Sequence, residues 1–516
     1  MDVKPQGPED RNALSFLGRS ALLNALGALE AIVAFLMDVV IAVTFGMGTH
    51  SDALYAALAL PQKIGRGVFQ NLTNSFMGLF GGSQESGAAY NQAITVITVA
   101  TLPLAAALSV TSEWWLPLTI PGATAEIQAA AVPLSRVLVW MIGLVPLSET
   151  LRAVYYQKGR VWLPSLTRLV GGGLAIALIL AARGGKGLAL AAWGVTIGTA
   201  VEAIMALILM PVLLGVRFRP SWPPKERLRE MIRVVGVPLS GQGAYLLSGL
   251  GEQVLSSLLP AGGITAANYA KRIMNTLERF VFRGFIITTI RSHAAEDRPD
   301  LRTDFRMLML FSMPIVLLLG VLSRPFVAVV FARGRFGPED VGTLAMTLQV
   351  YAPAVLIMAV SRIPVGLAYA QKRVRAILGN AVSFSVVLVL AEALFIYLGL
   401  GLRSFGLGYA VAALAGLVSL YVSLLRGQKA RIWDRLDTAR LLAVGLAAAI
   451  GTVLPSWAAG LWTSPSVTGS MIVLVAGAAG CVAFMAAAAY ALRMDEARQV
   501  LGLFKRLRPA TRRGGE

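Results

Sequence analysis

The sequence predicts an all-α membrane protein that crosses the bilayer about 14 times, as two six-helix lobes in a parallel pseudo-two-fold repeat plus two extra C-terminal helices. Its composition, a succession of long apolar runs and an internal duplication lead to this fold class. Hydrophobic residues make up 56% of the 516 residues, charged residues 14%, and the mean hydropathy is +0.69. Soluble chains are roughly 45–50% apolar and about 25% charged. The composition therefore excludes a string of soluble domains.

Apolar runs of transmembrane length occur fourteen times. A membrane-crossing helix needs about 20 mostly apolar residues, and glycine, proline or charged residues bound each run. We expect helices at 22–45, 52–80, 88–110, 129–151, 161–182, 187–214, 236–259, 265–290, 304–323, 342–370, 378–401, 406–425, 440–461 and 470–492. The first run is too long for the apolar core of a signal peptide, so we expect it to remain as a helix.

Positive charge is unevenly distributed between the loops on the two sides of the membrane. The chain holds 46 lysines and arginines against 27 acidic residues, a net charge of +19. Of these cations, 31 fall in the two terminal segments and the loops on their side, and six fall in the opposite loops. The positive-inside rule then places both termini in the cytoplasm. We expect the surplus charge to orient the chain in the membrane and not to bind nucleic acid.

Two parts of the chain match at a common offset of 214 residues. The pattern Tyr-x-Gln-Lys at 155–158 recurs at 369–372, and Gly-x6-Tyr-Ala at 48–56 recurs at 262–270. Each half contains six expected spans, an even number, so the halves run parallel, as in many transporters. The expected divisions are an N-terminal lobe over 1–214, a basic cytoplasmic linker over 215–235, a C-terminal lobe over 236–425, extra spans over 440–492 and a basic cytoplasmic tail over 493–516.

The residues that usually bind metals are scarce. Cys481 is the single cysteine, and the two histidines are His50 and His293. These numbers exclude an intramolecular disulfide, a cysteine-based zinc site and a histidine-rich metal site. The sequence also lacks the Gly-x4-Gly-Lys-Ser/Thr loop of ATP-binding proteins. We expect no metal and no cofactor.

Cations inside the expected spans are the most informative feature of the sequence. A charge at bilayer depth costs at least about 2.5–3.5 kcal/mol and normally faces a wet cavity or a partner. Arg272, Arg279 and Arg283 follow each other by seven and four residues, which places them on one helix face. The in-span cations are Lys63, Arg66, Arg136, Arg168, Lys271, Arg272, Arg279, Arg283 and Arg362.

These cations have three explanations. Arg168 and Arg283 lie near span ends, where snorkelling to the interface accounts for them. Internal ion pairs, such as Lys271 with Glu278, would neutralise others. We favour a central cavity with surplus positive charge. Because the arginine fork matches phosphate geometry, such a cavity would bind a phosphate or pyrophosphate headgroup.

Four stretches of the chain resemble the MurJ-type lipid II flippases. The first runs from Asp38 to Gly48 and continues through Ser51-Asp-Ala and Pro61. The others are Leu134-Ser-Arg with Tyr155-Tyr-Gln-Lys-Gly-Arg160, then Asn268-Tyr-Ala-Lys-Arg272, and finally Phe331-Ala-Arg-Gly-Arg-Phe336 followed by Asp340. The resemblance covers roughly residues 15–430.

This resemblance implies the multidrug/oligosaccharidyl-lipid/polysaccharide exporter fold and an alternating-access mechanism. The implied activity is to carry an undecaprenyl-diphosphate-linked cell-wall precursor, such as lipid II, from the inner to the outer leaflet of the bacterial inner membrane, with no enzymatic step. We expect the lipid-linked glycan and the bilayer as partners, and a monomer. Met37 and Ala31 stand where the family usually has arginines. The candidate substrate-binding residues are Asp38, Asp52, Arg66 and Arg272, which match family positions, together with Arg136, Lys63 and Arg279.

Other functions stay open at this point. A flippase for a different polyprenyl-linked polysaccharide would need the same cations. A drug/cation antiporter shares the expected fold but needs an acidic cavity, which the surplus of cations opposes. An enzyme acting on polyprenyl lipids needs carboxylates at the interface. The only acidic clusters, at 296–300 and 339–340, alternate with arginines as ordinary solvated loops do.

Overall fold

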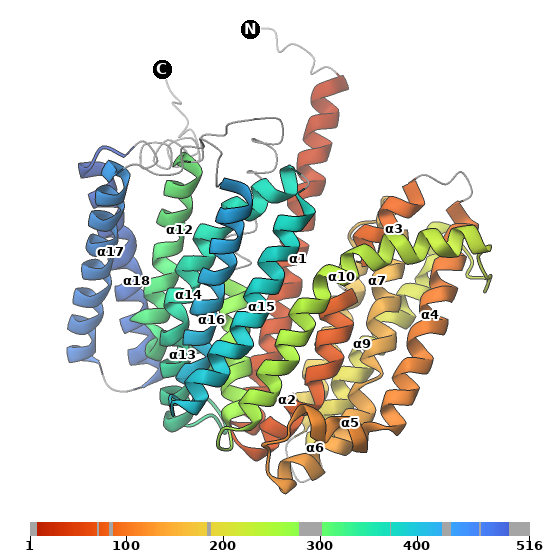
Figure 1. Ribbon diagram of the computed structural model, residues 1–516, viewed down its shortest axis with the longest axis horizontal. Coiled ribbons are helices and arrows are strands. Elements are labelled where there is room, and N and C mark those ends of the chain that lie inside the picture. Colours follow the sequence, from red (N-terminus) through yellow and green to blue (C-terminus); the bar gives the residue numbers. More distant parts are fainter. Residues whose placement is uncertain are drawn as a thin grey trace, which may run out of the picture. The chain divides into compact units, whose positions relative to one another are not determined.

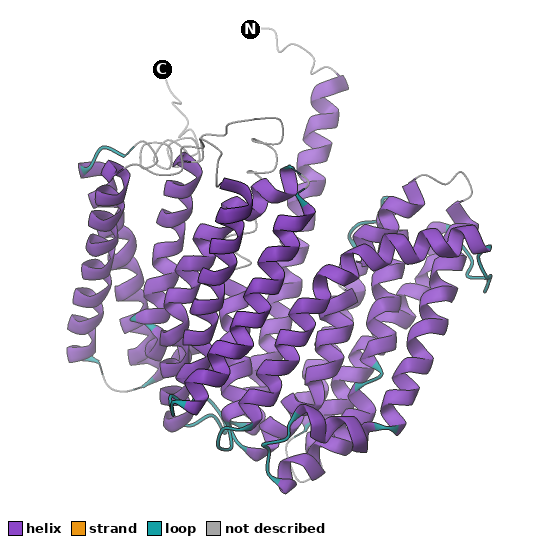
Figure 2. Ribbon diagram, viewed as in Figure 1, coloured by secondary structure: helices purple, strands orange, loops and turns teal. Residues whose placement is uncertain are grey.

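The computed structural model of the protein describes residues 8–69, 72–81, 86–182, 187–277, 302–371, 373–425, 435–463 and 466–494. Every regular element within these ranges is a helix (Figure 2), which confirms the predicted all-α class. Eleven described helices are long and apolar enough to cross a membrane. The three remaining expected spans are broken, polar or partly outside the described residues, so the total of 14 stays a prediction. They are 52–80, 236–259 and 265–290.

The helices of the N-terminal part follow one another with short connections (Figure 1). Proline starts or interrupts several of them, as expected where neighbouring membrane helices satisfy the freed backbone groups. They are α1 (Pro8–Phe45), α2 (Thr49–Pro61), the π-helix η1 (Gln62–Val68), α3 (Leu72–Gly81), α4 (Ser86–Val110), α5 (Ser112–Thr119), α6 (Ala125–Leu138), α7 (Met141–Gln157), α8 (Leu163–Ala181), α9 (Gly187–Leu214) and α10 (Lys225–Ser257).

The C-terminal part begins with a helix whose described residues are 263–277. Seven α-helices and a short π-helix follow it in the described residues. They are α12 (Arg302–Gly320), α13 (Ser323–Phe331), α14 (Pro338–Ala370), α15 (Val374–Tyr397), α16 (Arg403–Leu420), the π-helix η3 (Tyr421–Leu425), α17 (Arg435–Trp462) and α18 (Val467–Ala491).

The order of the helices repeats along the chain. In the first half a long and a short helix, α4 and α5, precede a 33-residue helical segment made of α6 and α7. In the second half α12 and α13 precede α14, which is also 33 residues long. Two further spans follow in each half, α8 with α9 and α15 with α16. The repeat supports the duplication predicted from the two short sequence patterns.

The chain packs as two compact units, Met1–Asn268 with Gly334–Phe336, and Tyr269–Arg333 with Gly337–Glu516. Helix α10 covers the second half of the predicted linker and the first expected span of the C-terminal lobe, and it packs against α2, α3 and η1 of the first unit. The predicted lobe, linker and tail limits stay a prediction.

The core of the first unit is built where α3, α4, α7 and α9 meet. Phe80 of α3 lies edge-on to Tyr90 of α4, with ring centroids 4.8 Å apart. Tyr155 of α7 is fully buried, and its hydroxyl donates to the carbonyl oxygen of Ala206 in α9 at 2.6 Å. Helices α8 and α9 pack at Gly171 and Gly198, where a Cβ on either residue would overlap the backbone of the other helix. These contacts fix the helices that carry the buried charges described below.

Helix α14 is central to the second unit, where it packs against α12, α13 and α16. Its buried Tyr351 lies 5.7 Å from the ring of Tyr409 in α16, and Phe384 of α15 meets Tyr409 edge-on at 5.1 Å. Helices α17 and α18 pair with each other beside α12 and α13. Gly451 and Gly480 allow that close approach, since an added Cβ at either position would overlap the opposite backbone.

Candidate functional site

A π-helix interrupts the second expected span at the two cations singled out in the sequence. Helix α2 ends at Pro61, and η1 carries Lys63 and Arg66. The Lys63 ammonium donates to the carbonyl oxygen of Gly249 in α10. Single π turns are frequent at functional sites because they place side chains where a regular helix would not. The structure therefore ties Lys63 to α10; the side chain of Arg66 is outside the described part of the structure.

Gly65 explains how this π turn fits against the rest of the unit. A Cβ on Gly65 would lie 3.2 Å from the carbonyl oxygen of Met141, at the start of α7. A larger residue here would require the backbone of η1 or α7 to shift by a few tenths of an ångström. The glycine between the two cations thus allows η1 to lie close to α7 without such a shift.

Asp52 holds the start of the helix at 263–277. Its carboxylate is almost fully buried and accepts hydrogen bonds from the backbone N–H of Gly262 at 2.6 Å and of Thr265 at 2.8 Å. The Thr265 hydroxyl donates to the same carboxylate at 2.6 Å. Carboxylates stabilise helix N-termini through such bonds and through the helix dipole. Asp52 is thus a capping residue for the helix that carries Arg272.

Asp38 is the second buried acid that the sequence singles out. It lies in the last part of α1, 6% exposed, and one carboxylate oxygen accepts a hydrogen bond from the Tyr55 hydroxyl of α2 at 3.3 Å. Tyr55 and its repeat counterpart Tyr269 are both fully buried. The structure thus places Asp38 against α2.

The helix at 263–277 carries two of the expected cations side by side. Lys271 and Arg272 are half-buried. The Lys271 ammonium lies 5.6 Å from the centre of the Tyr409 ring, a cation–π distance. Arg279, Arg283 and Glu278 fall outside the described residues, so the expected cationic stripe and the expected Lys271–Glu278 pair stay predictions.

Arg136 has an acidic partner near the end of α6. Its guanidinium pairs with the carboxylate of Glu113 in α5, and its Nε donates to the Ser112 hydroxyl at 3.3 Å. The side chains of Arg136 and Glu113 are 47% and 62% exposed. This contact neutralises the charge that the sequence assigns to substrate binding.

A buried ion-pair network in the first unit is the feature that the sequence interpretation missed. Arg168 of α8 donates to three carboxylates, Glu149 of α7 at 2.7 Å, Glu202 of α9 at 3.0 Å and Glu30 of α1 at 3.2 Å. The three glutamate side chains are only 9–12% exposed. Snorkelling, the expectation for Arg168, is therefore wrong: the guanidinium turns into the unit and joins three helices to α8.

Two further groups complete this network. Arg152 of α7 lies 3.4 Å from Glu30, and the Thr73 hydroxyl of α3 donates to Glu149 at 2.6 Å. The sequence did contain a signal for this network, because a glutamate inside a membrane span requires a cation or a hydrogen-bond donor as its partner. In the described residues no group of three acidic, cysteine or histidine side chains could hold a metal ion. The three glutamates Glu30, Glu149 and Glu202 instead surround the guanidinium group of Arg168.

Comparisons with known proteins identify the family. The family model described as "Lipid II flippase MurJ" matches residues 41–477. Two relatives, each named "Probable lipid II flippase MurJ", come from Bdellovibrio bacteriovorus and Aquifex aeolicus. The first is 28% identical over 241 residues, 44% of this chain and 45% of that protein, so the chain spans less than half of it in the alignment. The second is 25% identical over 423 residues, 79% of this chain and 83% of that protein.

Solved structures show the same fold. A lipid II flippase MurJ in an inward closed conformation matches with a TM-score of 0.77 and 15% identity, over 92% of this chain and 99% of that one. An inward-facing multidrug resistance MATE family transporter of the MOP superfamily matches with a TM-score of 0.63 and 16% identity, over 76% of this chain and 93% of that one. The fold and the resemblance predicted from the sequence are therefore confirmed, and the chain belongs to the MurJ family of lipid II flippases.

Proposed function

We propose that this protein moves lipid II, an undecaprenyl-diphosphate-linked precursor of the cell wall, from the inner to the outer leaflet of the bacterial inner membrane without covalent chemistry. The observation that carries the proposal is the family match over residues 41–477, which covers helices of both units. The fold alone would not separate this function from drug export, because a multidrug transporter has a similar structure.

The candidate contacts to the diphosphate are the cations of the π-helix and of the helix at 263–277. Lys63 and Arg66 lie on the π-helix that interrupts an expected span, and Arg272 lies on the continuous helix at 263–277 and matches a family motif. Guanidinium–phosphate bonds are charge-assisted and roughly twice as strong as neutral hydrogen bonds. Arg279 remains in the proposal on its sequence spacing.

The other predicted site residues have different roles in the proposal. Asp52 and Asp38 hold α2 in place, and we propose that they position the cations without touching the phosphate. Arg136 is the weakest candidate because Glu113 already pairs with it. For the mechanism we propose alternating access, which is the mode of transport of other transporters built from structural repeats.

Genetic complementation tests the proposed function. We expect expression of this chain to restore growth to bacterial cells whose own lipid II flippase has been depleted. The control is the same chain with Arg272→Ala, checked for equal abundance in the membrane. Failure of the unaltered chain, together with export of a cationic dye such as rhodamine 6G from the same cells, would instead favour the drug-antiporter alternative.

A further inference from the structure

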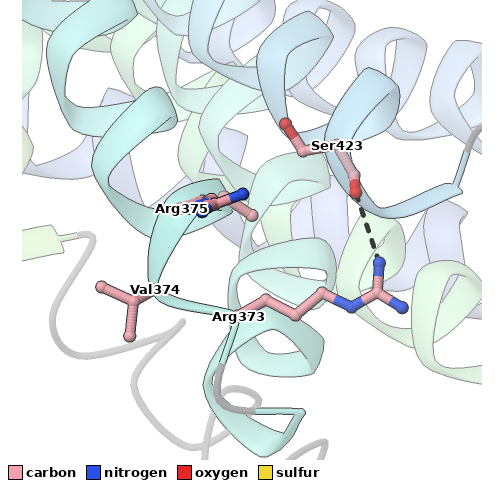
Figure 3. A pocket seen from close by; sticks show the side chains of 5 residues that line it. Arg373, Val374, Arg375 and Ser423 are labelled. Atoms are coloured by element: carbon pink, nitrogen blue, oxygen red, sulfur yellow. Dashed lines mark hydrogen bonds between the residues drawn. The ribbon is translucent and has the colours of Figure 1, made fainter.

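A pocket at one end of the second unit lies outside the proposed substrate site. It occupies about 400 Å³ where the turn after α14 leads into α15, beside η3 (Figure 3). Pockets of roughly 300–1,000 Å³ hold small ligands. The lining residues are Arg373, Val374, Arg375, Ala376 and Ser423.

The lining of this pocket is cationic. Arg373 and Arg375 contribute two guanidinium groups, and none of the lining residues is acidic. Arg373 reaches across the pocket, and its Nη1 donates to the carbonyl oxygen of Ser423 at 3.3 Å (Figure 3). That bond fixes the position of the guanidinium relative to η3. The pocket therefore contains the hydrogen-bonded guanidinium group of Arg373 and, two residues further along the chain, that of Arg375.

The backbone adds to this positive potential. Arg373 is the N-cap residue of α15, and Val374 and Arg375 form its first turn. The first N–H groups of a helix have no acceptor within the helix, and they form the positive end of its dipole. Anions with several oxygen atoms, such as phosphate esters, bind favourably at such an end.

An apolar stripe continues from the pocket along α15. Val374 lines the pocket and is 60% exposed, and exposed apolar side chains follow it at every fourth position over the whole helix. Successive members of this series are rotated by about 40° around the helix, so the first three share one face and the later ones wind toward the far side. The stripe beside the pocket consists of Val374, Leu378 and Val382, and Val386, Leu390 and Leu394 continue the series around α15. A ligand whose head occupies the pocket would thus meet a surface suited to an acyl chain.

We propose that this pocket binds the phosphate-ester headgroup of an anionic phospholipid, with an acyl chain along the stripe on α15. On the topology expected from the positive-inside rule, the pocket faces the cytoplasmic leaflet, where anionic lipids attract basic groups between membrane helices. The proposal does not depend on the transported substrate. A soluble phosphate would use the same arginines but would gain nothing from the stripe.

Native mass spectrometry of the purified full-length protein tests the proposal. Delipidated protein is mixed with phosphatidylglycerol or phosphatidylcholine of equal acyl chains, and the bound fraction is measured. Each arginine near the membrane surface strengthens binding of an anionic lipid about fivefold. We expect phosphatidylglycerol to bind at least tenfold better than phosphatidylcholine, and R373Q/R375Q to lose this preference.

Two further variants make the result specific. R324Q/R403Q removes two exposed arginines from the opposite side of the expected topology, so it should keep the preference within twofold. R373K/R375K keeps both charges and should retain most of the binding, which separates a lost site from a misfolded protein. The proposal would be overturned if R373Q/R375Q and R324Q/R403Q both lost the preference for phosphatidylglycerol. It would also be overturned if both variants kept that preference.

Inorganic phosphate separates the two sources of the ligand. If the site binds a lipid, 10 mM phosphate should leave most phosphatidylglycerol bound, because the acyl contacts remain. Full displacement by phosphate, with no difference between the two lipids, would overturn the lipid assignment. Because the readout is lipid binding and not flipping, failure of the proposed flippase function would leave this result unchanged.

Discussion

Replacing Arg168 by methionine would remove the cation that three buried carboxylates share. Methionine keeps most of the apolar stem but no donor. Glu30 would retain Arg152 at 3.4 Å, and Glu149 would retain the Thr73 hydroxyl at 2.6 Å. Glu202 would lose the guanidinium, its ion-pair partner among the described residues. We therefore expect Glu202 to bear the largest part of the cost.

The magnitude follows from the burial of these groups. Breaking a buried ion pair by removing one partner costs about 3–5 kcal/mol, because the other charge remains desolvated. The Arg168 side chain is 31% exposed, so water reaches part of it and the lower end, about 3 kcal/mol, applies. Unfolding entropy near Tm is about 2.1 cal/mol/K per residue, so in a unit that runs from Met1 to Asn268 one kcal/mol shifts Tm by a little under about 2 °C. The expected loss in Tm is therefore roughly 5 °C.

Thermal unfolding in detergent, followed by the fluorescence of the nine tryptophans, measures this loss. Arg136→Met is the matched control: its pair with Glu113 is largely exposed, and such pairs contribute about 0–1 kcal/mol. Adding Glu202→Gln to the Arg168→Met variant should recover part of the stability, since a neutral amide costs less to bury. Equal Tm values for the Arg168 and Arg136 variants, or a double variant less stable than Arg168→Met, would refute the reasoning.

Three other predictions concern single positions. Gly334→Ala should lower the yield of folded protein, because Gly334 has a φ of +62° and a Cβ there would overlap the carbonyl oxygen of Val43. Size-exclusion chromatography of membrane extracts measures this yield. An elution profile equal to that of the unaltered protein would contradict the predicted overlap. Asp52→Ala should lower the free energy of unfolding by about 1–2 kcal/mol through loss of a helix cap, a change that shows as a lower Tm; a Tm equal to that of the unaltered protein would argue against the capping role. In a Cys481→Ser background, a cysteine at Arg217 should react with an impermeant maleimide only after the cells are opened; labelling of intact cells would reverse the expected topology.

The long apolar helices and their duplication are predictable because both depend on local sequence. Hydropathy over about 20 residues marks a membrane helix, and Tyr-x-Gln-Lys ends corresponding helices in the two halves. The π-helix at Lys63 was not predicted, since no local pattern distinguishes a π turn from an α-helix. The span predicted for 52–80 therefore begins as α2, continues as η1 and includes α3 as a separate element.

The buried charges show where sequence reasoning ends. The partners of Arg168 lie 19, 34 and 138 residues away along the chain, so only the packing of four helices brings them together. Its place near a predicted span end favoured snorkelling, which depends only on position in the helix. The sequence predicts a cavity position for Arg136 because it is a cation inside an expected span, whereas its acidic partner Glu113 lies in another helix, 23 residues away. Partners that are distant in sequence are the information that one chain alone does not provide.

The rate at which proteoliposomes translocate fluorescent lipid II tests the central claim most directly. We expect vesicles with the unaltered protein to expose the lipid to an external quencher faster than empty vesicles do. Loss of charge-assisted bonds typically worth about 1.5–3 kcal/mol should make Arg272→Ala at least tenfold slower, while Arg403→Ala translocates at the unaltered rate. An unaltered protein no faster than empty vesicles would contradict the flippase function, and full activity of Arg272→Ala would contradict the assignment of its arginine to the substrate.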